Sequence, residues 1–135
     1  MILSDTSVIV AVINTVDANN RLCFETLKTV RTQIVTTWPC ITEAMYLLGA
    51  RIGWEGQEKL RQQIESGYIR ILEPTQADAL RACALMRKYA DSPMDFADAS
   101  LVVAADVLNI TRILTLDSHF YAYLINDKTH FEVIS

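Results

Sequence analysis

Short apolar runs alternate along the chain with longer stretches in which apolar residues recur at helical spacing. The short runs predict strands at residues 1–3, 34–36, 68–72, 113–116 and 131–134. The longer stretches predict helices at residues 6–16, 20–32, 39–50, 54–65, 76–89, 95–108 and 118–124. Strands that are separated by helices pair in parallel and are covered on both faces. We therefore expect an α/β fold, a three-layer α/β/α sandwich around a mostly parallel central sheet of about four to five strands.

The length and composition indicate one packed domain that spans residues 1–135. Of the 135 residues, 51% are hydrophobic and 21% are charged, which excludes the disordered and collagen-like classes. The richest apolar run, residues 101–108, contains Asp106 and is too short to span a membrane. The first residues lack the basic segment and cleavage site of a signal peptide. We therefore expect a cytoplasmic protein that does not enter membranes.

The cysteines and histidines argue against a disulfide framework and against a zinc site. The three cysteines are widely spaced, with no Cys-x-x-Cys pair, and there are only two histidines. Free cysteine is among the most frequently buried residue types. We therefore expect Cys23, Cys40 and Cys83 to be small core residues.

Acidic residues stand where the predicted strands end. Asp5 follows the first strand, Asp117 follows the fourth, and Glu43 lies one turn into the helix that leaves the second strand. Asp95 and Asp98 lie three positions apart in the first turn of a late helix and therefore share a face. Parallel sheets bind their ligands outside the carboxyl ends of the strands. These carboxylates are therefore expected to meet at one edge of the sheet.

A cluster of carboxylates favours a particular chemistry. Carboxylates that converge repel one another unless a cation lies between them. A set of oxygen ligands suits a hard cation such as Mg²⁺, which binds a few carboxylates together with water and substrate phosphate. Such a site can hydrolyse a phosphodiester. The net charge of −4 is unusual for a protein that binds nucleic acid, but a bound metal would supply the positive charge that meets the phosphate.

Each acidic residue also has a purely structural interpretation. Asp5 and Asp117 could cap the helices that follow them. Asp95 and Asp98 could be the cap and the third residue of a capping-box-like arrangement, and Glu43 could be a solvated helix residue. These interpretations would all have to hold at once, whereas the strand-end rule brings the residues together independently. We therefore favour a functional site.

Four short motifs occur in order along the chain. They are residues 4–7 (SDTS), 42–43 (TE), 98–102 (DASLV) and 114–120 (LTLDSHF). Each motif is weak by itself, but the ordered set is specific and covers nearly the whole chain. In its motifs and their spacing the chain resembles PIN-domain nucleases. It most resembles the compact toxin subunits of VapBC-type toxin–antitoxin pairs.

This resemblance implies the PIN-like sandwich fold, an Mg²⁺ or Mn²⁺ cofactor, endonucleolytic cleavage of RNA, a homodimer and a small antitoxin partner. By position, the acidic quartet of the family corresponds to Asp5, Glu43, Asp98 and Asp117. Of these catalytic residues, Asp5, Asp98 and Asp117 are the expected metal ligands. Ser7 matches a hydroxyl residue that supports the first aspartate. We expect Asp95, one turn before Asp98, to support the ligands or to reach the metal through water.

Four other classes of function can be weighed against a nuclease. A receiver-like signalling domain needs a phosphoacceptor aspartate after the third strand, where residues 72–74 read Leu-Glu-Pro. No phosphate-binding glycine motif is present either. We retain two alternatives. One is a non-catalytic PIN-like binding or scaffold module, and the other is a phosphohydrolase of small substrates. A scaffold would be expected to have lost carboxylates that this chain keeps, and a phosphohydrolase is distinguished by its substrates.

Overall fold

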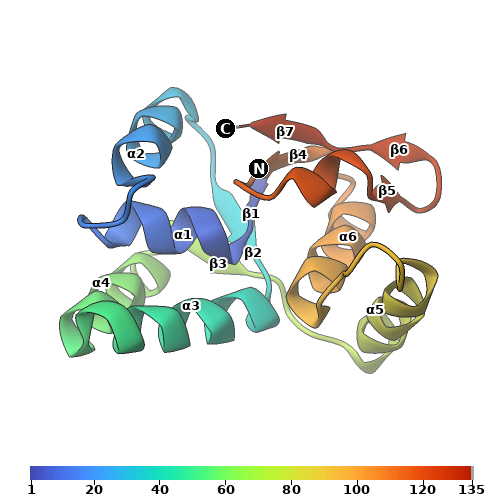
Figure 1. Ribbon diagram of the computed structural model, residues 1–135, viewed down its shortest axis with the longest axis horizontal. Helices are drawn as coiled ribbons and strands as arrows, with labels where there is room; N and C mark the ends of the chain where they lie inside the picture. Colours follow the sequence, from blue (N-terminus) through green and yellow to red (C-terminus); the bar gives the residue numbers. More distant parts are fainter. Residues whose placement is uncertain (135) are drawn as a thin grey trace.

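The computed structural model describes residues 1–134, in which strands and helices alternate (Figure 1). Five strands form the central sheet: β1 (Ile2–Ser4), β2 (Ile34–Thr36), β3 (Ile69–Ile71), β4 (Arg112–Leu114) and β7 (Glu132–Ile134). A separate two-stranded hairpin consists of β5 (Leu124–Ile125) and β6 (Thr129–His130). The sheet is thus assembled from strands that are far apart in the sequence.

The helices connect these strands. The α-helices are α1 (Thr6–Ile13), α2 (Asn20–Thr29), α3 (Trp38–Ile52), α4 (Trp54–Glu65), α5 (Gln76–Lys88) and α6 (Phe96–Leu108), and a 3₁₀ helix, η1 (Ser118–Tyr121), follows β4. Pro39 lies in the first turn of α3, a position that does not require its missing N–H. Within residues 1–134, no helix is both long enough and apolar enough to cross a membrane.

The order of the strands creates a switch point in the sheet. The order is β3-β2-β1-β4-β7, and neighbouring strands are parallel. From β1 the chain continues outward through β2 and β3, and then returns to place β4 and β7 on the other side of β1. The direction of winding therefore changes between β1 and β4. Open α/β sheets bind ligands at the carboxyl ends of the strands beside such a point.

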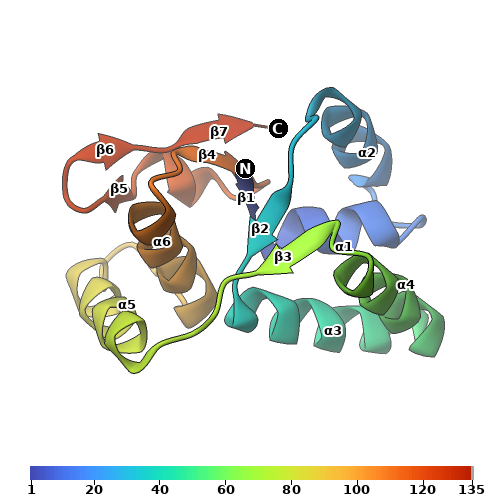
Figure 2. The same ribbon diagram turned by 180° about the vertical axis from the view of Figure 1, so that it is seen from behind.

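The two faces of the sheet pack against different helices. Successive side chains of a strand point to opposite faces. Ile2 and Ile34 therefore join the core formed with α1, α2, α3 and α4. Leu3 and Val35 join the core formed with α6 and the segment around η1. Seen from behind, α5 and α6 lie together on one side of the molecule and α1 to α4 gather on the other (Figure 2). The expected sandwich around a parallel sheet is confirmed.

Helix α1 is shorter than its apolar pattern predicts. The pattern predicts a helix to residue 16, but α1 ends at Ile13. Asn14 is extended, and its buried side chain accepts a hydrogen bond from the Val16 amide at 3.2 Å. An Asn side chain that bonds to the backbone two residues on favours a turn over a helix. The apolar Val16 consequently lies in solvent rather than in the core.

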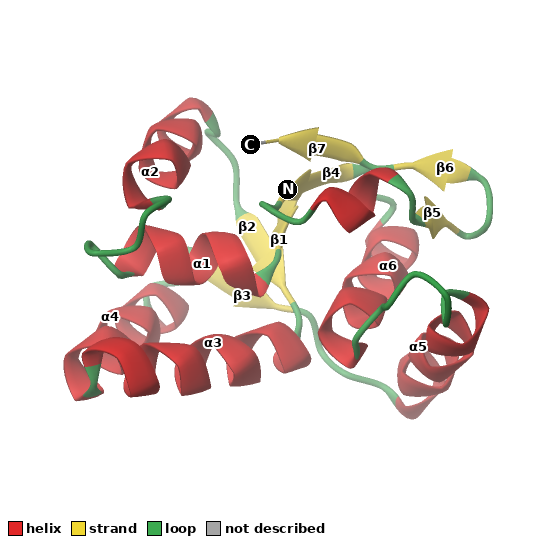
Figure 3. Cartoon of the chain, viewed as in Figure 1, coloured by secondary structure: helices red, strands yellow, loops and turns green. Residues whose placement is uncertain are grey.

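The carboxyl-terminal part also departs from the prediction. A helix is predicted at residues 118–124, but η1 ends at Tyr121 and the chain then forms the β5–β6 hairpin (Figure 3). Asn126 and Asp127 at its turn have positive φ values of 51° and 60°. The Lys128 amide donates to the Ile125 carbonyl at 3.1 Å across this turn, whose two central residues both need positive φ, which Asn and Asp tolerate better than most residues. The turn therefore brings β6 back beside Leu124 and Ile125, which pair as a strand instead of continuing the helix.

The prediction that all three cysteines are core residues was wrong for one of them. Cys23 and Cys40 are buried, whereas Cys83 is exposed. Cys83 lies on α5, where the neighbouring Ala82 is the residue buried against the rest of the protein. Successive helical residues point about 100° apart, so burial of Ala82 turns Cys83 toward solvent.

A pair of leucines tests where the stabilising core lies. Leu101 on α6 is fully buried, whereas Leu80 on α5 is 60% exposed. We expect Leu101→Ala to lower the free energy of unfolding by about 2–5 kcal/mol, because it removes buried methyl groups and leaves a cavity. Leu80→Ala should change it by no more than about 0.5 kcal/mol. Urea unfolding followed by circular dichroism measures both, and equal losses would contradict the assigned core.

Candidate active site

Asp5 lies directly after β1 and is 6% exposed. It caps α1, because its Oδ1 accepts from the Val8 amide at 3.1 Å. The Ser7 hydroxyl donates to the same oxygen at 2.6 Å, and the Thr115 hydroxyl donates to Oδ2. A buried carboxylate is costly unless its oxygens are hydrogen-bonded. These three donors allow Asp5 to be buried with a defined orientation.

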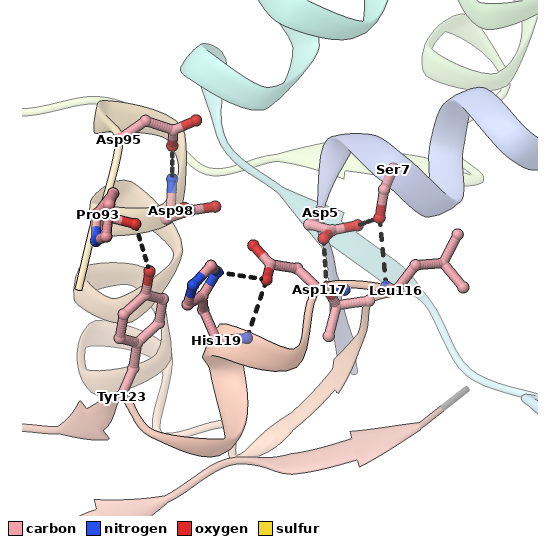
Figure 4. A network of polar contacts seen from close by, with 10 residues as sticks. Asp5, Ser7, Pro93, Asp95, Asp98, Leu116, Asp117, His119 and Tyr123 are labelled. Atoms are coloured by element: carbon pink, nitrogen blue, oxygen red, sulfur yellow. Dashed lines mark hydrogen bonds and ion pairs between the residues drawn. The ribbon is translucent and has the colours of Figure 1, made fainter.

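The same two hydroxyls connect Asp5 to the end of β4. The Ser7 oxygen accepts from the Leu116 amide at 3.3 Å (Figure 4). The Thr115 oxygen accepts from the Asp117 amide at 2.9 Å. Each hydroxyl thus donates to the Asp5 carboxylate and accepts from the backbone that carries Asp117. This network fixes the two acids relative to one another across the switch point.

Asp117 caps the short helix η1 and also holds a histidine. Its Oδ1 accepts from the His119 amide at 2.9 Å and lies 2.8 Å from the Nδ1 atom of the same residue. The His119 ring also stacks on Tyr123, with centroids 6.3 Å apart. The carboxylate of Asp117 is therefore oriented from one side by the imidazole, and it reaches toward Asp98 (Figure 4).

Asp95 and Asp98 occupy the amino end of α6. Asp95 caps this helix, because its Oδ1 accepts from the Asp98 amide at 2.7 Å. The Asp98 side chain projects away from Asp95 and toward Asp117 (Figure 4). The capping interpretation of Asp95 is therefore correct, and Asp98 has the side chain that faces the other acids.

The mutual repulsion of these acids is visible in their pKa values. Burial raises the pKa of the Asp98 carboxyl to about 7, and the negative charges of Asp95 and Asp117 contribute. Burial also raises the pKa of Asp5, although its bonds to Ser7 and Thr115 favour the ionised form. A carboxyl that is both desolvated and close to like charges gains from a nearby cation. The acids of β1, β4 and α6 thus act on one another electrostatically.

Glu43 lies on α3, at the side of this cluster. It lines a hollow of about 220 Å³ together with Thr6, Ser7 and Leu116, which flank Asp5 and Asp117 in the sequence. Helix α3 is tied to α1 by the Thr6 hydroxyl, which donates to the Cys40 carbonyl at 3.2 Å. Glu43 is not among the charges that raise the pKa of Asp5 or Asp98. It therefore borders the site from the side of α3.

The donor set fits a hard cation in its chemistry. All of the acids offer carboxylate oxygens, the ligand type that Mg²⁺ and Mn²⁺ prefer. Among residues 1–134, however, no three His, Cys, Asp or Glu side chains are grouped closely enough to enclose a metal ion. The acids share one edge of the sheet, and the pKa values of Asp5 and Asp98 are raised there, but the acids do not form a closed cage.

Two residues of this network were not singled out from the sequence. Thr115 was predicted only as part of a strand, yet its hydroxyl links Asp5 to the Asp117 backbone. Its position two residues before a strand-end aspartate is the signal that could have identified it. Tyr123 is fully buried beside the acids, and its contacts carry no local sequence signal.

The fold and the edge of acidic residues define the class of protein. A family model described as the PIN domain matches residues 2–124. The chain belongs to the PIN-domain family, as its motifs predicted.

Individual relatives extend this assignment. Ribonuclease VapC26 from Mycobacterium tuberculosis is 25% identical over 120 residues, which cover 89% of each chain. Among solved structures, the fold is similar to that of VapC20 from the same organism, a toxin that cleaves the sarcin–ricin loop, with a TM-score of 0.84, 20% identity and coverage of 90% of this chain and 94% of that one. It is also similar to a chain of a toxin–antitoxin complex from Klebsiella pneumoniae, with a TM-score of 0.72, 16% identity and coverage of 100% and 97%. The predicted resemblance to VapC toxins is confirmed.

The raised pKa of Asp98 predicts how the metal-free protein responds to pH. The folded carboxyl has a pKa of about 7 against an ordinary value of 3.8, so the folded state binds the proton more tightly than the unfolded state. This residue therefore stabilises the fold below pH 3.8, and the contribution is lost as the pH rises to about 7.

We expect Asp98→Asn, which cannot ionise, to abolish this loss. In the presence of a chelator, the Tm of the variant should rise relative to the parental Tm as the pH increases through this range. Asp91→Asn, at an exposed position of the preceding loop, is the matched control. Thermal unfolding by calorimetry at several pH values measures the difference, and parallel curves for Asp98→Asn and the parent would contradict the assignment.

Proposed function

We propose that this protein is a divalent-metal-dependent endoribonuclease whose catalytic residues are Asp5, Glu43, Asp98 and Asp117. One observation carries the proposal: acids from β1, β4 and α6 converge beside the switch point and raise the pKa of Asp98. A fold does not by itself determine an activity, so the site must support the assignment. The similarity to Ribonuclease VapC26 supports the same activity over most of the chain.

The proposed catalytic residues would have different roles. Asp5, Asp98 and Asp117 would hold Mg²⁺ or Mn²⁺. When bound, the ion would polarise the scissile phosphodiester and lower the pKa of a water molecule. Ser7 orients the Asp5 carboxylate through its 2.6 Å hydrogen bond. Glu43, which lines the hollow beside Ser7, would contact water or the substrate.

Asp95 has a supporting role in this scheme. Its Oδ1 is engaged by the Asp98 amide, so it fixes the first turn of α6 and thereby the direction of the Asp98 side chain. Its negative charge also raises the pKa of Asp98 and so strengthens the attraction of that site for a cation. Asp95 therefore acts through Asp98 rather than on the metal directly.

We further propose that the protein is the toxin of a toxin–antitoxin pair. The fold is similar to chains of toxin–antitoxin complexes over the full length of this chain. In this role its RNA substrate would be cellular, its location cytoplasmic and its partner a small antitoxin protein. A homodimer, as the resemblance implies, would complete the assembly.

Removal of a single proposed ligand should abolish cleavage. We expect Asp5→Asn and Asp98→Asn each to lower the rate of RNA cleavage by at least about 100-fold, more than is typical for residues that only support a metal ligand. Asp91→Asn is the control, because this exposed acid lies outside the site. Cleavage of a labelled RNA in Mn²⁺ measures the rates, and circular dichroism verifies the fold. Parental rates in both site variants would refute the assignment.

Metal binding and substrate assays on the parental protein and on the Asp98→Asn and Asp91→Asn variants distinguish a nuclease from the two retained alternatives. Mn²⁺ at millimolar concentration should raise the parental Tm, because a ligand of the folded state alone stabilises it. The rise should disappear in Asp98→Asn and persist in Asp91→Asn. A scaffold module would bind RNA without cutting it, and a phosphohydrolase would act on small phosphomonoesters while leaving RNA intact.

A comparison of Asp95 with Asp98 tests their different roles. Asn is as good a helix cap as Asp, so Asp95→Asn should preserve the hydrogen bond to the Asp98 amide and remove only the charge. We expect its cleavage rate to fall by no more than about tenfold, the lower end for residues that support a ligand. Asp98→Asn should be much more severe. The reverse order in a cleavage assay would exchange the two assignments.

A further inference from the structure

Two tyrosines join the loop before α6 to the segment after η1. The Tyr123 hydroxyl donates to the Pro93 carbonyl at 3.2 Å (Figure 4). In the opposite direction, the Tyr89 hydroxyl accepts from the Leu124 amide at 3.0 Å. The two rings meet edge to face, with centroids 5.1 Å apart. Each tyrosine thus originates on one segment and bonds to the backbone of the other.

The Tyr123 bond lies close to the acids. Pro93 is two residues before Asp95, and Met94 between them is buried in the core. The Asp95 side chain in turn accepts from the Asp98 amide. At the other end, Tyr123 packs against Phe120 and stacks on His119, the partner of Asp117. Tyr123 therefore contacts both segments that carry the acids of α6 and η1.

The surroundings of Tyr123 keep its hydroxyl a donor. The side chain is fully buried, and burial raises the pKa of the phenol, to which the negative charges of Asp98 and Asp117 contribute. The proton is consequently retained and remains available to the Pro93 carbonyl. The packing against Phe120 and Tyr89 also leaves the ring little freedom to turn.

We propose that Tyr123 is a positioning residue, which through its bond to Pro93 sets the distance between the Asp95–Asp98 turn and Asp117. This inference rests on the proposed function, because the distance matters only if these acids bind a metal together. Tyr89 serves a different purpose, since its bond attaches Leu124, at the start of the β5–β6 hairpin, to the end of α5, whereas Tyr123 bonds to Pro93, two residues before Asp95. The two tyrosines are therefore separable.

The experiment compares three Tyr→Phe variants by their affinity for Mn²⁺. Tyr123→Phe removes the bond to Pro93 and keeps the ring, and Tyr89→Phe removes the bond to Leu124. Tyr121→Phe is the control, because Tyr121 is 62% exposed. Calorimetric titration should give an affinity about threefold to tenfold weaker for Tyr123→Phe, less than for direct partners of ligands. The kcat of RNA cleavage should fall with little change in KM.

The outcomes distinguish a positioning role from a structural one. Weakened Mn²⁺ binding in Tyr123→Phe but not in Tyr89→Phe supports the proposal. This holds even if urea unfolding shows that the two substitutions destabilise the fold equally. Parental affinity in Tyr123→Phe, or equal weakening in Tyr123→Phe and Tyr89→Phe, overturns it. If the parental protein bound no Mn²⁺ and cut no RNA, the proposed function itself would fail. Should Tyr123→Phe not fold, Pro93→Gly loosens the same exposed loop residue and is expected to weaken Mn²⁺ binding in the same way.

Discussion

The buried carboxylate of Asp5 joins the architecture of the sheet to its chemistry. An ionisable group that is almost entirely removed from water requires hydrogen bonds to each oxygen, and Ser7, Thr115 and the Val8 amide provide them. The two hydroxyls are themselves held by the backbone that follows β4. The contact between β1 and β4 and the orientation of the first acid are therefore maintained by the same few atoms.

Helix capping and site formation are parts of one arrangement here. Asp5, Asp95 and Asp117 each accept from an amide in the first turn of the helix that follows. Helix amino ends favour negative charge, which reduces the cost of assembling several carboxylates at one edge. The raised pKa of Asp98 indicates that this compensation is incomplete. The structural and functional interpretations of these acids thus coexist.

The similarity to VapC20 illustrates how little sequence identity this fold needs. A TM-score of 0.84 accompanies only 20% identity. The core of this chain consists mainly of aliphatic residues on the two faces of the sheet and on the helices that cover them. Cores of this kind tolerate exchange of hydrophobic residues when volume and pattern are kept. Polar contacts such as the one between Ser7 and Asp5 depend on particular atoms and allow far less substitution.

The sequence by itself determined the alternation of strands and helices and the placing of acids at strand ends, because both follow from local periodicity and the geometry of parallel sheets. It did not determine which face of α5 is covered, so Cys83 was misplaced, nor the hairpin at Asn126 and Asp127. Only the tertiary structure decided that Thr115 bonds to Asp5 and Tyr123 to Pro93. Such contacts join residues that are distant along the chain, and no local pattern records which partner a buried hydroxyl will meet.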